Sequence, residues 1–575
     1  MSDPSRVPHN LRQYVVEQDY AQYSEIDQAV WRFVLLQTYE RLARSAHPAY
    51  ATGLGKAGIS VEHIPRIAEI SGCLERFGWS AVCVDGFIPP RAFQEFQAAS
   101  ILPIAADMRT KDHLVYTPAP DIIHEAAGHA PILPDARYAE YLRAIGEVGK
   151  KAFSSPEDAR VYRAIFDLSE VKETPGLAPE AVARAENRLT RALAEVSYTS
   201  EASRLSRLYW WTAEYGLVGT PRDYKLYGAG LLSSLWESHT CHDQAVQKLP
   251  FSASCVEVPY DITRTQPQLF VARDFEQLFD VLAEVDAALA YRRGGDVALT
   301  AALTSEELAT LVLQDQSFVS GELRAVTGNA RAGVVTLRGR IGLGVDGRLA
   351  RVFDAAPAGY RMPVGRLRDG AALAELTAET LRSRYAEGAR MRLRFASGLE
   401  LEGELARVDS DAHGRIATAL FRDYTLEIPG GTGFREQGAE YLLCAATEIV
   451  TARAGALDPA FFPESEASGA LVPKPRTFEG RERALLGLFE QAVSAFRERL
   501  GSAVVPAFSA IHAELQREFA DEWLLRWNLL ECLCRLGQHE ELASELEAEL
   551  AALEIRFSYR EPIATGLRYL SALAA

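Results

Sequence analysis

The chain has 575 residues, of which 48% are apolar and 24% are charged, a composition typical of globular proteins in water. This length exceeds what a single hydrophobic core supports, so we expect about three or four structural units. The 61 Lys and Arg residues against 78 Asp and Glu residues give a formal net charge of −17. That charge argues against nucleic acid or an anionic membrane as a partner.

The sequence carries neither a targeting signal nor a disulfide pattern. Segment 2–17 is polar and lacks the apolar region of a signal peptide. No run of about eighteen apolar residues, the length of a membrane span, occurs. The seven cysteines are odd in number and scattered, which is typical of a reducing compartment. We therefore expect a cytoplasmic protein that does not associate with a membrane.

Helical periodicity dominates the chain to about residue 290. Apolar residues recur at spacings of three and four in stretches such as 28–46 and 275–291. This is the pattern of amphipathic helices. The sequence predicts a mainly α unit over residues 1–295.

Segment 117–129 contains a proline-punctuated turn, then two imidazoles and a carboxylate at His124, Glu125 and His129. In the common zinc-hydrolase motif the two histidines are four positions apart and share one helix face. A separation of five is about 500° around an α-helix, roughly 140° from the first direction. Gly128 and Pro131 would let the helix bend or end between the histidines, so that both rings meet one metal.

A charged, alanine-rich stretch over about 150–206 predicts a pair of helices, and an aromatic run at 208–217 follows it. This run contains Glu214, a carboxylate that would be costly to bury without a partner. A cation bound to Glu214 would offset the cost. Together with His124 and His129 it would form the set of two histidines and one carboxylate that suits non-haem Fe(II). A zinc hydrolase with Glu125 as general base is the alternative.

Alternating apolar and polar residues replace the helical period from about Gly333. Examples are the runs 335–338 and 391–395, and Ser397-Gly398 forms a turn signal after the second. This pattern predicts β-hairpins. We expect a small β-barrel or sandwich over about 325–455.

The remaining sequence predicts a linker and a helical unit. Residues 456–478 are rich in Pro, Ser, Gly and Glu, as linkers are. Amphipathic stretches such as 483–500 and 540–553, with Gly537 as a break before the second, predict helices. We expect an α-helical domain over 479–575.

Three motifs resemble the pterin-dependent aromatic amino acid hydroxylases, in particular the bacterial phenylalanine 4-monooxygenase-like members. They are His124-Glu125-x-x-Gly128-His129-x-Pro131, the run 209–217 and the run 227–234. The similarity spans about 60–290 and includes the runs 91–93 and 260–267. It implies a mainly α catalytic domain of the hydroxylase type, followed by the small β domain and the C-terminal α-helical domain. Since the stretch 150–206 is longer than in animal members, we interpret it as inserted helices.

The resemblance also implies two cofactors, Fe(II) and tetrahydropterin. Fe(II) would be bound by His124, His129 and Glu214. The pterin would occupy a pocket in which Phe93 stacks on the bicyclic ring. The residues implied for that pocket are Phe93, Glu125 and Tyr209.

A further set of residues is implied for the amino acid substrate. Arg109 would bind its carboxylate through the planar guanidinium. Asp121, about one turn before His124, would orient a metal ligand or a metal-bound water, and would count with Glu214 as catalytic. The other implied substrate contacts are Thr117, Trp210, Ser233 and Ile262.

Substrate choice follows from the shape of the cavity. Trp210 and Ile262 predict an apolar pocket with no group to meet a phenol hydroxyl, so tyrosine is the least expected substrate. Small differences in apolar bulk discriminate by only about 1–3 kcal/mol. We expect phenylalanine to be hydroxylated to tyrosine with O2, with tryptophan as the alternative substrate. A pterin-recycling enzyme is the partner considered for the β and C-terminal units.

Overall fold

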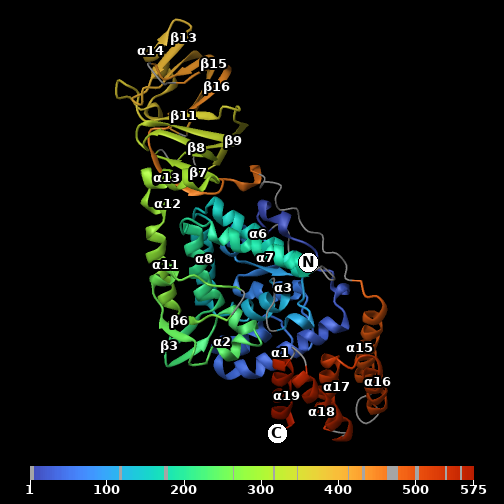
Figure 1. Ribbon diagram of the computed structural model, residues 1–575. Coiled ribbons are helices and arrows are strands. Elements are labelled where there is room, and N and C mark those ends of the chain that lie inside the picture. Colours follow the sequence, from blue (N-terminus) through green and yellow to red (C-terminus); the bar gives the residue numbers. More distant parts are fainter. Residues whose placement is uncertain are drawn as a thin grey trace.

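The computed structural model describes residues 6–114, 120–173, 179–262, 265–314, 317–345, 348–411, 413–429, 434–462, 477–498, 504–537, 540–556 and 560–574. Figure 1 shows a mainly helical body in blue to green, yellow strands that project from one end, and red helices packed against the other. No helix within these ranges is long and apolar enough to cross a membrane.

Helices make up most of the body, as the sequence predicts. Helix α1 (Glu25–Ser45) begins at a capping box, in which Ser24 and Asp27 each bind the other's backbone N–H group. The helix is buried along much of its length and runs through the hydrophobic core of the body. The other helices are α2 (Pro48–Lys56), α3 (Ile67–Leu74), α4 (Pro90–Ala98), α5 (Ala136–Gly149), α8 (Glu201–Tyr209), α9 (Ala229–Ser233), α10 (Glu237–Thr240), α11 (Phe275–Ala288), α12 (Ala290–Arg293) and α13 (Gly295–Ser305).

Two small sheets support the helices. Strands β1 (Ser80–Val84) and β2 (Ile101–Ala105) pair in parallel and are buried throughout. Helix α4 connects them, and the segment after β2 leads to Arg109. The second sheet has the order β4-β3-β6-β5 and consists of β3 (Leu217–Thr220), β4 (Asp223–Leu226), β5 (Gln247–Pro250) and β6 (Gln268–Ala272).

The alanine-rich stretch forms helices α6 (Pro156–Glu173) and α7 (Pro179–Ala194), which pack against each other. Ser155, Ser200 and Ser203 fix the start of this pair, because all three bind the Asp158 carboxylate or its backbone N–H. The two helices therefore leave the body and return to it at one point.

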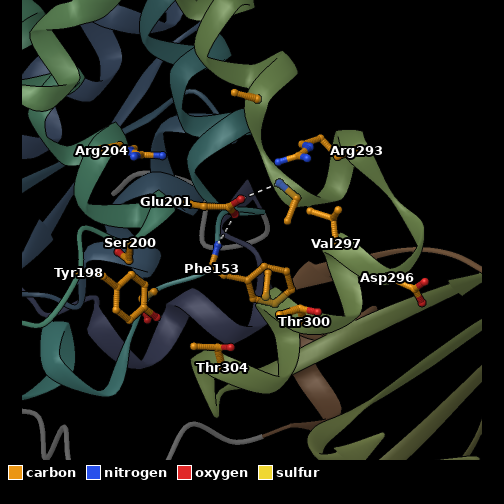
Figure 2. A pocket seen from close by; sticks show the side chains of 14 residues that line it. Phe153, Tyr198, Ser200, Glu201, Arg204, Arg293, Asp296, Val297, Thr300 and Thr304 are labelled. Atoms are coloured by element: carbon orange, nitrogen blue, oxygen red, sulfur yellow. Dashed lines mark hydrogen bonds between the residues drawn. The ribbon is translucent and has the colours of Figure 1, made fainter. Parts of the chain in front are cut away.

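The junction with the strands contains a pocket of about 510 Å³, shown in Figure 2. The Glu201 carboxylate accepts the N–H of Phe153 at 3.1 Å and the N–H of Ala290 at 2.6 Å. It thereby connects three segments that are distant in sequence. Helix α13, which follows α12, packs on strands β8 (Phe318–Gly328) and β17 (Ile449–Ala454).

The strands form two antiparallel sheets that share one hydrophobic core. Strand β7 (Leu308–Leu313) begins earlier than the expected 325 and pairs with β17, so the first and last strands are neighbours. Among the described residues the strands form two separate sheets rather than one closed barrel. The remaining strands are β9 (Gly333–Val345), β10 (Arg348–Asp354), β11 (Tyr360–Val364), β12 (Ala386–Glu387), β13 (Arg390–Arg394), β14 (Glu400–Ser410), β15 (Ile416–Glu427) and β16 (Arg435–Cys444), with α14 (Ala378–Tyr385) before β12.

The C-terminal helices pack directly on α1. Phe33 contacts Trp523 and Trp527 edge to face, with ring centroids 5.0 and 4.7 Å apart, and all three side chains are buried. One continuous core therefore joins this region to the body. Most of the expected linker, 463–476, lies outside the described residues. The helices are α15 (Gly480–Glu498), α16 (Val505–Glu518), α17 (Trp523–Leu536), α18 (Glu540–Arg556) and α19 (Arg560–Ala574).

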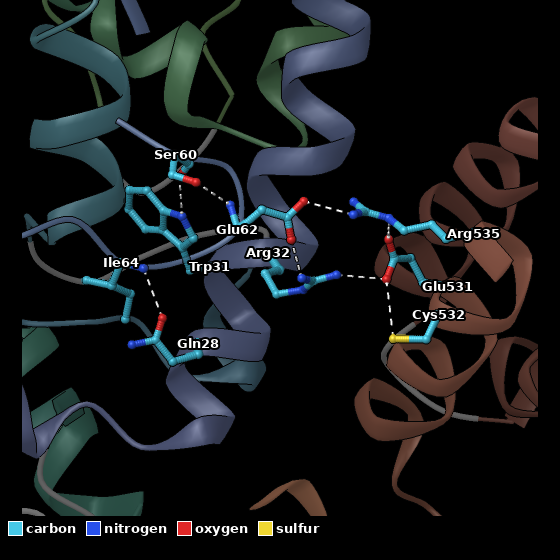
Figure 3. Close-up of polar contacts among 9 residues, drawn as sticks. All are labelled: Gln28, Trp31, Arg32, Ser60, Glu62, Ile64, Glu531, Cys532 and Arg535. Carbon is cyan, nitrogen blue, oxygen red and sulfur yellow. Dashed lines mark hydrogen bonds and ion pairs between the residues drawn. The ribbon is translucent and has the colours of Figure 1, made fainter. Parts of the chain in front are cut away.

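Charged residues also connect the C-terminal helices to the body, as Figure 3 shows for Arg32, Glu62, Glu531 and Arg535. The Glu531 side chain is fully buried and is paired with Arg32 at 2.8 Å and with Arg535. Arg535 in turn lies 2.9 Å from Glu62 of the body. Because removing one partner of a buried pair leaves a charge without compensation, these residues fix how the helices dock.

Substituting Phe33 tests the docking. Phe33→Ala removes a fully buried ring, which costs about 3–5 kcal/mol. We expect the free energy of unfolding, measured by urea titration with tryptophan fluorescence, to fall by this amount. Tyr39→Ala is the matched control, since this ring lies on the same helix but is 43% exposed. Equal losses in both variants would contradict the contact.

Candidate functional site

The two histidines of the motif lie on a π-helix, Ile123–His129, whose hydrogen bonds join residues five apart. In this way the Ala130 N–H donates to the Glu125 carbonyl at 3.3 Å. Residues five apart therefore share a face, and the rings of His124 and His129 have centroids 5.1 Å apart. The prediction that the helix bends or ends between the histidines is wrong, because the wider winding itself aligns the rings.

A second π-helix brings Glu214 to the same point. Helix α8 continues into the turn Trp210–Glu214, which the Tyr215 N–H closes on the Trp210 carbonyl at 2.8 Å. Glu214 Oε2 lies 3.2 Å from His124 Nε2, and Oε1 lies 3.1 Å from His129 Nε2. One ligand atom from each residue falls within 4.8 Å of the others, the only such group of His, Cys, Asp or Glu in the described ranges.

A close helix contact orients His124. Helix α9 crosses the π-helix at Gly128, where a Cβ would lie 2.6 Å from the Ala229 carbonyl oxygen. Ser233 Oγ donates to that carbonyl at 2.8 Å and lies 3.1 Å from His124 Nδ1. Since the hydroxyl proton is used on the carbonyl, His124 donates Nδ1–H to Ser233, which leaves Nε2, on the side of Glu214, as the nitrogen that would bind a metal ion. Ser233, expected at the substrate, thus also holds an imidazole in the tautomer that binds metal.

Burial and charge act in opposite directions on these groups. Burial alone raises the pKa of Glu214, but His129 and His124 hold it well below its usual range. Burial lowers the pKa of His124, but Glu214 raises it to about 9. Glu125 is different, because its burial dominates and raises its pKa. A pocket that favours the Glu214 carboxylate this strongly suits a bound cation, and two imidazoles with one carboxylate suit Fe(II).

A cleft of about 1300 Å³ adjoins the three residues. His124 and Glu214 line it, whereas His129 is fully buried beneath them. Phe93 and Tyr209 meet edge to face with centroids 5.6 Å apart, and the Tyr209 hydroxyl accepts from Gln97 at 2.6 Å. Of the expected cofactor and substrate residues, the cleft is lined by Phe93, Arg109, Glu125, Tyr209, Trp210, Ser233 and Ile262.

Trp210 has neighbours that sequence reasoning missed. Tyr215 stacks on it with centroids 4.6 Å apart, and Tyr260 with centroids 4.2 Å apart. Two rings this close cannot share one face of the indole, so both faces are covered. The implied contact of Trp210 with the substrate stays a prediction, and it would have to be made through the edge of the indole. Tyr260 begins the run 260–267, and its aromatic side chain is the sequence signal that could have indicated a neighbour of Trp210.

Arg109 and Asp121 form a buried bidentate pair. Nε and Nη2 of Arg109 donate to the two carboxylate oxygens at 2.7 and 2.8 Å. Asp121 also accepts the backbone N–H of His124 at 3.0 Å and of Arg109 at 3.1 Å. Burial alone raises the pKa of Asp121, but Arg109 and these N–H groups hold it below its ordinary value. Asp121 therefore positions Arg109 and, through the backbone N–H of His124, the start of the π-helix that carries the expected metal ligands. Its expected role toward a metal-bound water stays a prediction.

One expected residue and one ion pair that was not expected remain to be placed. Thr117 lies outside the described residues. Arg91 and Glu307, which the sequence did not assign, form an ion pair at the cleft. Glu307 stands just before β7, so no motif near the histidines could have indicated it.

Removing the Ser233 hydroxyl tests the metal centre. Ser233→Ala deletes the group that fixes the His124 tautomer, and losing such a partner typically costs 10–100-fold in metal affinity. We expect the affinity for Fe(II), measured by anaerobic titration, to fall by about this factor. Ser234→Ala is the matched control, because the Ser234 hydroxyl accepts the Glu237 N–H instead. Unchanged affinity in Ser233→Ala would contradict the assignment.

Comparisons with known proteins agree with this geometry. The family described as biopterin-dependent aromatic amino acid hydroxylase matches residues 13–162 and 179–293, and the unmatched residues 163–178 include the end of α6. Phenylalanine-4-hydroxylase of Ralstonia nicotianae is 30% identical over 270 residues, which are 46% of this chain and 72% of that protein. The Pseudomonas aeruginosa enzyme of the same name is 28% identical over 48% of this chain and 92% of its own length.

Solved structures with similarity to the chain include phenylalanine hydroxylase from Chromobacterium violaceum with bound iron(III) and 7,8-dihydrobiopterin. It is 26% identical and covers 50% of this chain and 91% of that one, with a TM-score of 0.37. The match to the Ralstonia relative, spanning most of its length, decides the family. The chain belongs to the biopterin-dependent aromatic amino acid hydroxylases.

Proposed function

We propose that the chain hydroxylates phenylalanine to tyrosine with Fe(II), a tetrahydropterin and O2. The observation that carries this proposal is the convergence of His124, His129 and Glu214 at an aromatic-lined cleft. Relatives named phenylalanine-4-hydroxylase support the choice of substrate, and a related structure contains iron and dihydrobiopterin. Iron and the pterin, when bound, supply the electrons needed to cleave dioxygen.

The side chains of the cleft bind and orient the reactants. His124, His129 and Glu214 hold the metal on one side and leave its other positions open to the cleft. Glu125 Oε2 is buried and has no hydrogen-bond partner within the described ranges, so it is available to the pterin. Phe93 and Tyr209 provide aromatic surface for the pterin ring.

Arg109 serves the substrate in this proposal. Its guanidinium is buried and fixed by Asp121 through Nε and Nη2, which leaves Nη1 for the substrate carboxylate. A fixed guanidinium at the cleft binds a carboxylate with little loss of side-chain entropy. The aromatic ring would then point into the apolar part of the cleft, where Ile262 lies. Excluding water there strengthens each charged contact.

The alternatives are less well supported. The named relatives favour phenylalanine over tryptophan. A zinc hydrolase that uses Glu125 as base is not favoured, because the family to which the chain belongs is biopterin-dependent.

The proposal includes a division of the chain into three domains. The catalytic domain would comprise residues 1–295, the β domain would comprise strands β7 to β17, and the helical domain would comprise α15 to α19. The hydrophobic core of the strands is separate from that of the body and includes Ala298, Leu299 and Ala302 of α13, which supports the first boundary. Since the C-terminal helices share the core of the body, we propose that they are permanently attached to it.

Oxygen uptake tests the activity directly. We expect anaerobic reconstitution with Fe(II), then addition of tetrahydropterin, O2 and phenylalanine, to give tyrosine by mass spectrometry. Tryptophan and tyrosine should give at least about tenfold lower kcat/KM, which corresponds to roughly 1.4 kcal/mol. Glu214→Gln, which removes the ligand charge, is the control and should give no product. Pterin-independent hydrolysis with zinc bound would instead establish the hydrolase alternative.

A further inference from the structure

The C-terminal helices also contact the segment that carries Arg109. Lys111 lies two residues after Arg109, in the short 3-10 turn Lys111–His113, and its ammonium group forms an ion pair with Glu522 Oε2. Glu522 directly precedes α17, far outside residues 13–293, to which the family similarity is confined. The contact therefore joins a residue peculiar to the attached helices with the proposed substrate site.

Glu522 is held so that one oxygen faces Lys111. Its Oε1 caps α17 by accepting the N–H groups of Leu524 at 3.1 Å and Leu525 at 3.3 Å. Its own N–H donates to the Phe519 carbonyl at 3.0 Å, and its carbonyl accepts from Arg526. The residue is 2% exposed. A carboxylate fixed by this many bonds is a rigid anchor, since little freedom remains to be lost on pairing.

The Arg109 segment is thereby fixed at two points. On one side Asp121 binds the Arg109 guanidinium and its backbone N–H. On the other side Glu522 binds Lys111, whose side chain is 28% exposed. The Thr110 hydroxyl, between the two, hydrogen-bonds His113 Nδ1 at 3.3 Å. Without the second point, the main chain beside Arg109 would depend on the body alone.

The docking of the helices does not require this ion pair. Phe33 with Trp523 and Trp527 supplies the apolar contact, and Arg32 with Glu531 supplies the buried charges. The Lys111–Glu522 pair is a separate contact, between the N-terminus of α17 and the substrate segment. Its position therefore points to a role in the site.

We infer that Glu522 is a positioning residue for the hydroxylation: acting through Lys111, it fixes the segment that presents Arg109 to the substrate carboxylate. This inference rests on the proposed function, because it requires Arg109 to bind the amino acid. The carboxylate of the substrate takes no part in the hydroxylation of the ring, so Arg109 binds it equally in the ground state and in the transition state. A loosened segment should therefore raise KM for phenylalanine and leave kcat nearly unchanged.

Two variants of the pair test the inference. Glu522→Gln keeps the shape and the acceptor that caps α17 but removes the charge, and Lys111→Met removes the partner. We expect each to raise KM for phenylalanine about 5–20-fold, with kcat and KM for the tetrahydropterin within twofold of the parent. The double variant should be no worse than the poorer single variant, because both changes break the same interaction.

Glu62→Gln is the matched control. Glu62 pairs with Arg32 of the body and, across the same interface, with Arg535 of α17, and it is not among the residues that line the cleft. It should lower Tm without raising KM for phenylalanine. The inference is overturned if KM stays within twofold in the two test variants, or if Glu62→Gln raises it equally.

The activity of the parent chain toward phenylalanine distinguishes a failure of the inference from a failure of the proposed function. If it hydroxylates phenylalanine and KM does not move in the variants, only the role of Glu522 is wrong. If the parent fails to hydroxylate phenylalanine, the proposed function and the inference fail together. Far-ultraviolet circular dichroism of each variant identifies a change of fold. Loss of folding in Glu522→Gln would leave the decision to Lys111→Met, which changes a partly exposed side chain.

Discussion

The active site depends on the π-helical winding of residues Ile123–His129. In an α-helix, residues five apart point roughly 140° away from each other, so His124 and His129 could not face one carboxylate. The π-helix removes this difference, and a second π-turn delivers Glu214. Such windings are rare and are found mostly at functional sites. Here the contact of α9 with Gly128 supports the unusual backbone, because no side chain larger than hydrogen would fit between them.

Asp121 joins the metal centre to the proposed substrate site. One of its oxygens accepts the N–H of His124 at the start of the π-helix, and both oxygens accept from Arg109. A displacement of either partner would therefore act on the other. Burial makes this coupling strong, since a low dielectric strengthens the pair and penalises its loss. The distance between the metal centre and the proposed site for the substrate carboxylate is thus set within one short stretch of chain.

Both attached regions contact elements that bear expected binding residues. The strands reach α4, which carries Phe93, through the Glu307–Arg91 ion pair. The C-terminal helices reach the Arg109 segment through Glu522 and Lys111. The additional sequence therefore lies next to the cleft, although the strands project from one end of the body (Figure 1). These contacts therefore fix α4 and the Arg109 segment of the catalytic body at additional points.

The sequence by itself determined the elements whose signals are local. Apolar periodicity indicated the helices of the first part, alternation indicated the strands from Gly333, and Gly537 indicated the end of α17, where its φ is 61°. The spacing of His124 and His129 and the setting of Glu214 identified them as candidate ligands. Only the tertiary structure decided that the helix widens, that two tyrosines cover Trp210, and that Asp121 binds Arg109. The sequence likewise could not predict the strand that begins at Leu308 or the Glu522–Lys111 pair. These features depend on contacts between residues distant in sequence, whose free energies no local pattern records.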